Sequence, residues 1–182
     1  GCVQSAATPN VVASLLKVLH HQGMDAEVFH EGCCGALDYH LSAHEAGMQR
    51  MKAVIDQLYP RIDHIDYIVS SATGCGVTIR DYPEMLQYDA EYRDKASAIV
   101  DKLVDPIEIV SGEAIEVTTT RVAVHTPCSM QHGLGLTGAV EKLLGDTGFD
   151  ITPHREGHLC CGSAGTYSVL QPELSQQLKA RK

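Results

Sequence analysis

The cysteines of this chain fall into two sets with nearly the same spacing. In each set a lone cysteine stands about thirty positions before a vicinal Cys-Cys-Gly sequence: Cys2 before Cys33 and Cys34, and Cys128 before Cys160 and Cys161. The copies are offset by 126 positions for the lone cysteine and by 127 for the pair. A duplication that keeps its thiols in register indicates that the thiols do chemistry. It also predicts two related lobes, residues 1–112 with a helical connector and residues 113–182.

The first set gains a fourth thiol from Cys75, which glycines flank on both sides. Four thiolates are enough for a [4Fe–4S] cluster or for a structural zinc ion, because soft sulfur ligands select these metals. No secretory signal is visible in this sequence and adjacent cysteines rarely bridge each other, so we expect no disulfide scaffold. The residues leave three alternatives open: an iron–sulfur cluster, zinc, or thiols without a metal. The absence of a C-x-x-C sequence favours the cluster over zinc.

The second set has three thiols, and the counterpart of Cys75 would fall near position 202, beyond the last residue. Either the second lobe is truncated at its C-terminus or a histidine completes the set. The candidate histidines are His125, His132 and His158. A separate pair, His40 and His44, has the i, i+4 spacing of a weak zinc-like signal on a helix.

Composition excludes several classes of partner. The net charge of −9, with no basic stripe, argues against a nucleic-acid partner. No apolar run approaches the roughly 20 residues that a membrane-spanning helix needs. We therefore expect a cytoplasmic protein without a transmembrane segment. Gly1 precedes a key cysteine and the last residues read as helix, so we expect that both ends are cut.

Apolar periodicity predicts alternating helices and strands. Helices are predicted over 10–22, 42–59, 84–103 with a break near Tyr88, 138–148 and 172–182, and strands over 26–29, 67–70, 121–125 and 149–151; residues 72–76 and 104–119 read as a loop and a connector. Strands separated by helices favour an α/β fold, with mainly parallel sheets flanked by helices. The cysteines would then lie on loops after strands, at the edge where the carboxyl ends of parallel strands meet.

Five segments together resemble the cysteine-rich CCG-domain family. They are Gly1-Cys2-Val3-Gln4, Gly32-Cys33-Cys34-Gly35-Ala36-Leu37, Thr73-Gly74-Cys75-Gly76, Pro127-Cys128-Ser129-Met130-Gln131-His132 and the run from His158 to Tyr167. This family includes the B subunit of heterodisulfide reductase, lactate-utilisation iron–sulfur proteins and the iron–sulfur subunits of glycolate oxidase (glycolate dehydrogenase). The string Leu-Cys-Cys-Gly-Ser-Ala-Gly-Thr-Tyr resembles the glycolate oxidase branch most.

The resemblance implies an iron–sulfur electron-transfer subunit of a flavin-dependent 2-hydroxyacid dehydrogenase. Flavoprotein subunits would supply electrons, which would pass to a quinone or another acceptor. The protein itself would be cytoplasmic and at most peripherally associated with the inner face of the membrane. The implied ligands are Cys2, Cys33, Cys34 and Cys75 at one [4Fe–4S] centre and Cys128, Cys160 and Cys161 at the other. Heterodisulfide reductase-type members carry a further cysteine where this chain has Ala72, which disfavours disulfide-reducing chemistry here. A zinc-bound or metal-free docking scaffold and a thiol–disulfide reductase remain the alternatives.

Overall fold

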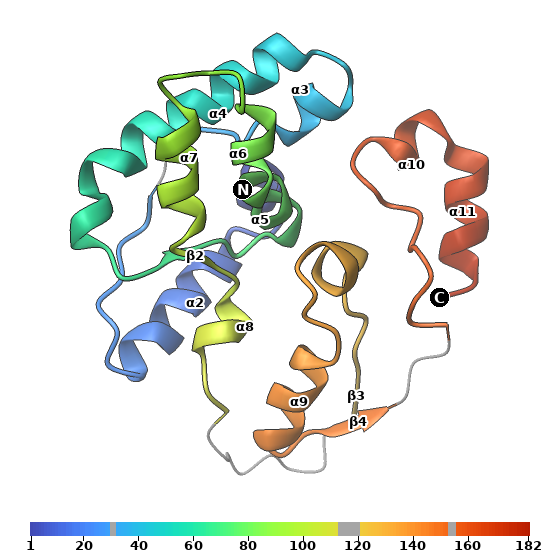
Figure 1. Cartoon of the computed structure of the whole chain (residues 1–182). Coiled ribbons are helices and arrows are strands. Elements are labelled where there is room, and N and C mark those ends of the chain that lie inside the picture. The colour runs from blue at the N-terminus through green and yellow to red at the C-terminus, as the bar shows by residue number, and fades with distance from the viewer. Residues whose placement is uncertain (30–31, 113–120, 153–155) are drawn as a thin grey trace. The chain divides into compact units, whose positions relative to one another are not determined.

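The protein is described by a computed structural model that covers residues 1–29, 32–112, 121–152 and 156–182 (Figure 1). The chain divides into two compact units, Gly1–Val110 and Ser111–Lys182. Each unit combines helices with a short two-stranded parallel sheet. The predicted α/β class is therefore confirmed.

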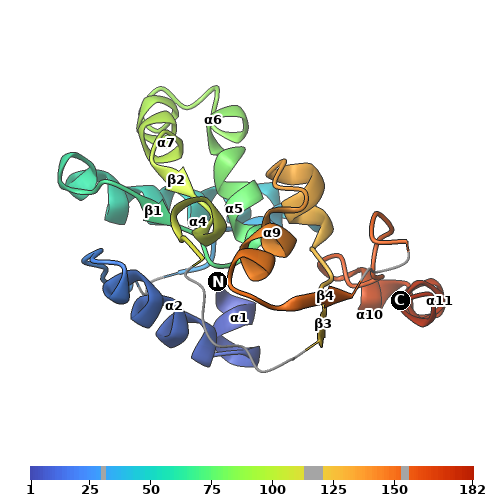
Figure 2. The ribbon, with the colours of Figure 1, turned by 90° about the horizontal axis from the view of Figure 1, so that it is seen from below.

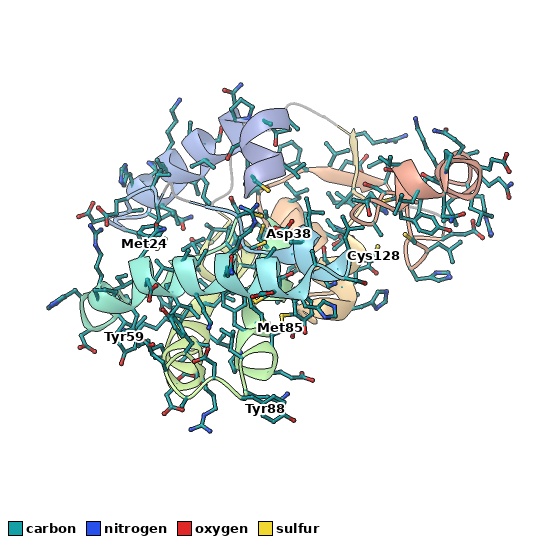
Figure 3. The ribbon with its side chains drawn as sticks, turned by 90° about the horizontal axis from the view of Figure 1, so that it is seen from above. Met24, Asp38, Tyr59, Met85, Tyr88 and Cys128 are labelled. Atoms are coloured by element: carbon teal, nitrogen blue, oxygen red, sulfur yellow. The ribbon has the colours of Figure 1, made fainter. Side chains whose placement is uncertain are left out.

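The first unit is mostly helical. Its elements are α1 (Cys2–Ala7), α2 (Asn10–His21), α3 (Ala36–His40), α4 (His44–Leu58), the 3-10 helix η1 (Tyr59–His64), β1 (Ile68–Val69), α5 (Thr73–Arg80), α6 (Tyr82–Met85), α7 (Arg93–Val100), β2 (Leu103–Val104) and α8 (Pro106–Ile109). Strands β1 and β2 pair in parallel, with Ile68 opposite Leu103. Figures 2 and 3 show α4 at a level between α1 and α2 on one side and α6 and α7 on the other.

The core of the first unit forms around one face of α4. Met51 and Ile55 are one turn apart on this helix, and both are fully buried. They belong to one apolar cluster with Tyr82 and Ile99, which are also fully buried. Tyr88, in the segment between α6 and α7, is by contrast almost fully exposed, at the edge of the molecule in Figure 3. The predicted break near this residue is thus confirmed, because the helical pattern over 84–103 resolves into α6 and α7.

A capping box fixes the start of α8. The carboxylate of Asp105 accepts a hydrogen bond from the backbone N–H of Ile107, and the carboxylate of Glu108 accepts one from the N–H of Asp105. Asp105 is buried, so its loss would leave backbone donors without a partner. We expect Asp105→Ala to lower the free energy of unfolding by about 1 to 2 kcal/mol in chemical denaturation. The exposed Asp101→Ala is the control and should change it by less than about 0.5 kcal/mol.

The second unit is built around a parallel βαβ crossover. Its elements are β3 (Arg121–Ala123), the π-helix η2 (Ser129–Gly133), α9 (Ala139–Asp146), β4 (Asp150–Thr152), α10 (Tyr167–Leu170) and α11 (Pro172–Ala180). Val122 of β3 pairs with Ile151 of β4, and α9 packs against β4 (Figure 1). Gly138 is the N-cap residue of α9 and has a φ of +76°, a conformation that favours glycine.

Three predictions about local structure were wrong, for residues 26–29, for Cys75 and for Cys2. Residues 26–29 form no strand, and no described residue pairs with them, which a strand requires. Cys75 lies in helix α5 rather than in a loop, because Thr78 and Ile79 give that helix a buried face. This packing outweighs the helix cost of Gly74 and Gly76, roughly 1 kcal/mol each.

Cys2 likewise lies in a helix, α1, rather than on a loop after a strand. Of the predicted connector, residues 104–112 contain β2 and α8, and residues 113–119 lie outside the described part of the chain. No helix among the described residues has the length and apolar character needed to cross a membrane.

Candidate metal centre

Three separate segments of the first unit bring four thiols together. Cys2 lies in α1, Cys33 and Cys34 lie in the loop before α3, and Cys75 lies in the first turn of α5. The sulfur atoms of Cys2 and Cys33 are 3.6 Å apart. The thiols of Cys34 and Cys75 form a second hydrogen-bonded pair. We call these four residues the first thiol set.

The two pairs of the first thiol set lie close enough to act on each other electrostatically. The hydrogen bond from Cys34 lowers the pKa of the Cys75 thiol to about 7, although burial and the charges of Cys2 and Cys33 oppose this shift. The same hydrogen bond, together with burial, raises the pKa of Cys34 well above its ordinary value. Burial and the contact with Cys33 also raise the pKa of Cys2. Because the thiols are closely spaced, the negative charge of one thiolate disfavours ionisation of the next. A bound cationic centre would offset this repulsion between the thiolates.

The Cys-Cys-Gly turn of the first thiol set rests on the backbone of α4. Gly35 has a φ of +81°, and a Cβ atom at this position would lie 2.5 Å from the carbonyl oxygen of Gly47. Gly47 in turn meets Tyr39, since a Cβ atom there would lie 2.9 Å from the Cβ of that residue. Two glycines therefore allow the loop that carries Cys33 and Cys34 to contact the helix directly.

Tyr82 holds the same turn from the other side. Its side chain is fully buried, and its hydroxyl donates a 2.8 Å hydrogen bond to the carbonyl oxygen of Cys34. Burial, followed by the nearby thiols of Cys34 and Cys75, raises the pKa of Tyr82, so the phenol keeps its proton and remains a donor. The sequence analysis missed this residue, because no spacing or motif relates Tyr82 to a cysteine 48 positions earlier.

Removing the Tyr82 hydroxyl should destabilise the turn. We expect Tyr82→Phe to lower the free energy of unfolding of the metal-free chain by about 1 to 3 kcal/mol, since the carbonyl of Cys34 would lose its buried donor. The matched control is Tyr92→Phe, whose exposed hydroxyl donates to Asp56 in the same unit. Denaturant unfolding of the control should differ from the wild type by less than about 0.5 kcal/mol. Equal effects of the two changes would show that the Tyr82 contact does not hold the turn.

Two side-chain contacts complete the surroundings of the first thiol set. The Gln4 amide donates to the backbone carbonyl of Ser71 and accepts from its hydroxyl, at 3.1 and 2.8 Å, which holds α1 against the segment before α5. Arg50 of α4 forms an ion pair with Asp38, labelled in Figure 3. The pKa of Arg50 is raised, first by this carboxylate and to a lesser degree by the thiols of Cys33 and Cys2. The thiols therefore lie within the electrostatic reach of one exposed guanidinium group.

The second unit repeats this geometry. Cys128, marked in Figure 3, caps η2, and it forms a hydrogen bond with Cys160 as Cys2 does with Cys33. Burial and the neighbouring Cys160 raise the pKa of Cys128. The backbone N–H of Gly162 donates to the sulfur of Cys160 at 3.3 Å. We call Cys128, Cys160 and Cys161 the second thiol set.

The glycine after the second pair is constrained like its counterpart. Gly162 has a φ of +83°, and a Cβ atom there would lie 2.6 Å from the carbonyl oxygen of Ser175 in α11. The Ser175 hydroxyl also donates to the carbonyl of Gly162 at 2.8 Å. Both Cys-Cys-Gly turns thus combine a left-handed glycine with a helix backbone behind it.

The histidines considered as ligands are not gathered into a coordination site. Among the described residues, no group of three or more His, Cys, Asp or Glu side chains is arranged to hold a single metal ion. His158 lines a pocket of the second unit, and His44 stacks on Tyr39 with 4.6 Å between ring centroids. The chemistry of the donors in the first thiol set, four soft thiols with one already acidic, fits an iron–sulfur cluster.

Comparison with known proteins agrees with this donor chemistry. The cysteine-rich CCG domain matches residues 1–80 and 122–182, which include all seven cysteines. The chain belongs to this family. The family predicted from the Cys-Cys-Gly strings is thereby confirmed.

Curated relatives align with the whole chain. The chain is 41% identical to the glycolate oxidase iron-sulfur subunit of Escherichia coli (strain K12), and it spans 46% of the length of that protein. It is 30% identical to lactate utilization protein A of an Exiguobacterium species and 31% identical to that of Bacillus subtilis (strain 168), of which it spans 76% and 77%. The chain therefore corresponds to about half of the first relative and to three quarters of the other two.

Proposed function

We propose that this chain is the cysteine-rich part of an iron–sulfur subunit in a flavin-dependent 2-hydroxyacid dehydrogenase, of the glycolate oxidase type. The observation that carries the proposal is the repeated geometry of the two thiol sets, each with a lone cysteine hydrogen-bonded to the first cysteine of a Cys-Cys-Gly turn. The 41% identity to a glycolate oxidase iron-sulfur subunit supports the substrate class. The two lobes, residues 1–112 and 113–182, would each carry one centre.

In this proposal the residues of the first thiol set hold a [4Fe–4S] cluster, and Cys128, Cys160 and Cys161 supply ligands to a second centre. When bound, such a cluster accepts and returns one electron at a time. The chain's own groups fix the ligands: Tyr82 and the Gly35–Gly47 contact hold the first turn, and Ser175 holds the second. The Gly162 N–H, which donates to the Cys160 sulfur, would raise the reduction potential by stabilising negative charge on that sulfur.

The partners in this proposal are flavoprotein subunits of the same complex, which would oxidise the 2-hydroxyacid and deliver the electrons. The acceptor would be a quinone or another electron carrier, reached from the cytoplasmic side of the membrane. The assignment of glycolate rather than lactate follows the more similar relative.

The test is reduction of the cluster by substrate. The full-length protein would be isolated from its host without oxygen, with any flavin-containing subunit that accompanies it, and mixed with glycolate or with lactate. We expect electron paramagnetic resonance to show a reduced iron–sulfur signal after glycolate and a much smaller one after lactate. A lactate signal as large as the glycolate signal would move the substrate assignment to the lactate branch. No signal with either acid, in a preparation that dithionite does reduce, would contradict the electron-transfer role.

A further inference from the structure

A glutamine follows the lone cysteine of each thiol set. Gln4 stands two positions after Cys2, and Gln131 stands three positions after Cys128. The two glutamines are 127 positions apart, which is also the offset between the two Cys-Cys-Gly sequences. The duplication therefore keeps this glutamine in register with the vicinal cysteines.

In the first unit, Gln4 connects the helix that carries Cys2 to the segment that leads to Cys75. Its side-chain N–H donates to the carbonyl oxygen of Ser71 at 3.1 Å, and its side-chain oxygen accepts from the Ser71 hydroxyl at 2.8 Å. Ser71 lies four positions before Cys75, just ahead of α5. None of the residues of α1, all of which the structure describes, is buried. Apolar packing does not fix this helix, so the hydrogen bonds of Gln4 help to determine where Cys2 lies.

In the second unit, Gln131 makes an equivalent connection. The two N–H groups of its side chain donate to the carbonyl oxygens of Thr126 and Gly157, at 2.6 and 3.1 Å. Thr126 lies two positions before Cys128, and Gly157 lies three positions before Cys160. One side chain thus joins the segment of the lone cysteine to the segment of the vicinal pair.

We propose that Gln4 and Gln131 are positioning residues, which hold Cys2 beside Cys33 and Cys128 beside Cys160. A glutamine amide is a hard donor group, so these side chains would act through the cysteines and not as ligands of a cluster. Their purpose rests on the proposed function, because ligands that are held together before metal arrives lose less conformational entropy when they bind it.

The experiment measures how closely each pair of thiols is held in the metal-free chain. The whole 182-residue chain would be equilibrated with mixtures of reduced and oxidised glutathione, and its disulfides would be located by mass spectrometry of proteolytic peptides. Each disulfide forms in two exchange steps that convert one oxidised glutathione into two reduced ones, so the equilibrium constant gives the effective concentration of one thiol beside the other. Because no metal is present, the result does not depend on whether a cluster assembles.

Each glutamine variant is the control for the other. Gln4→Leu removes the amide but keeps a side chain of similar size, and we expect the effective concentration of Cys2 beside Cys33 to fall by at least about fivefold. The value for Cys128 and Cys160 should stay within about twofold of the wild type, because that pair lies in the other unit. Gln131→Leu should give the opposite pattern.

Two further measurements separate positioning from a general loss of structure. Ser71→Ala removes only the hydroxyl that donates to Gln4, so we expect a smaller decrease for the first pair than Gln4→Leu gives. The pair Cys34 and Cys75, whose turn Tyr82 holds, should keep its value in Gln4→Leu. Wild-type effective concentrations in both leucine variants would overturn the proposal. An equal fall for Cys34 and Cys75 in Gln4→Leu would also overturn it, since the first unit would then have lost its structure as a whole.

Discussion

Gly35→Ala should lower the free energy of unfolding of the metal-free chain by about 3 kcal/mol, one of the two largest effects that we expect. The backbone at Gly35 has a φ of +81°, which costs a residue with a Cβ atom about 1 kcal/mol or more. The new methyl group would also lie 2.5 Å from the carbonyl oxygen of Gly47, inside a helix whose backbone cannot move away cheaply. Denaturant unfolding measures the sum of the two costs.

Two other glycines of the same unit separate these costs. Gly23 has a φ of +79° but nothing within 4 Å of a Cβ atom, so Gly23→Ala should cost only the conformational part, about 1 kcal/mol. Gly74 lies in α5 with open space around it and without a positive φ, so Gly74→Ala should be neutral or stabilising by up to about 1 kcal/mol. If Gly35→Ala proves no worse than Gly23→Ala, the contact between the turn and α4 does not constrain the site.

Cys34→Ser should weaken cluster binding by the first thiol set, lowering its affinity by more than about tenfold relative to the wild type. A serine oxygen is a hard, poorly ionised ligand. The variant would therefore lack the soft donor that iron–sulfur clusters require, and it would lose the contact between the Cys34 and Cys75 thiols. The measurement is the iron and sulfide that the chain retains after anaerobic reconstitution and desalting. Cys75→Ser should give the same loss, because it removes the other member of the same pair.

The matched control for this loss is Cys161→Ser, the equivalent cysteine of the second pair. It should leave the cluster of the first thiol set in place, because that set lies wholly in the first unit. Retention of all the bound iron by Cys34→Ser would remove Cys34 from the ligand set. Complete loss of iron in Cys161→Ser would show instead that the two thiol sets do not bind independently.

The sequence predicted the thiol sets because the chemistry lies in residue type and spacing, which a duplication displays directly. Cys2 and Cys33 are 31 positions apart and their sulfur atoms are 3.6 Å apart. Helices α2 and α4 were predicted within a few residues, since their apolar faces are long and periodic. Strand β1 was also predicted, although its ladder is shorter than the apolar run that indicated it.

The parts that the sequence did not reveal depend on tertiary contacts. Residues 26–29 have strand composition, but a strand forms only where another strand pairs with it. The role of Tyr82 depends on a hydrogen bond across 48 positions, which leaves no local signal. Gly47 did leave one, since a glycine inside an otherwise regular helix often marks a close approach of another segment.

Metal and sulfide content tests most directly whether the thiols assemble a cluster. The 182-residue chain would be incubated with ferrous iron, sulfide and an equal amount of zinc in the absence of oxygen, then desalted, analysed and reduced with dithionite. The proposed first centre predicts equal amounts of bound iron and sulfide, little zinc, and a paramagnetic signal that appears on reduction. Stoichiometric zinc without sulfide, or a folded chain that binds neither metal, would contradict it.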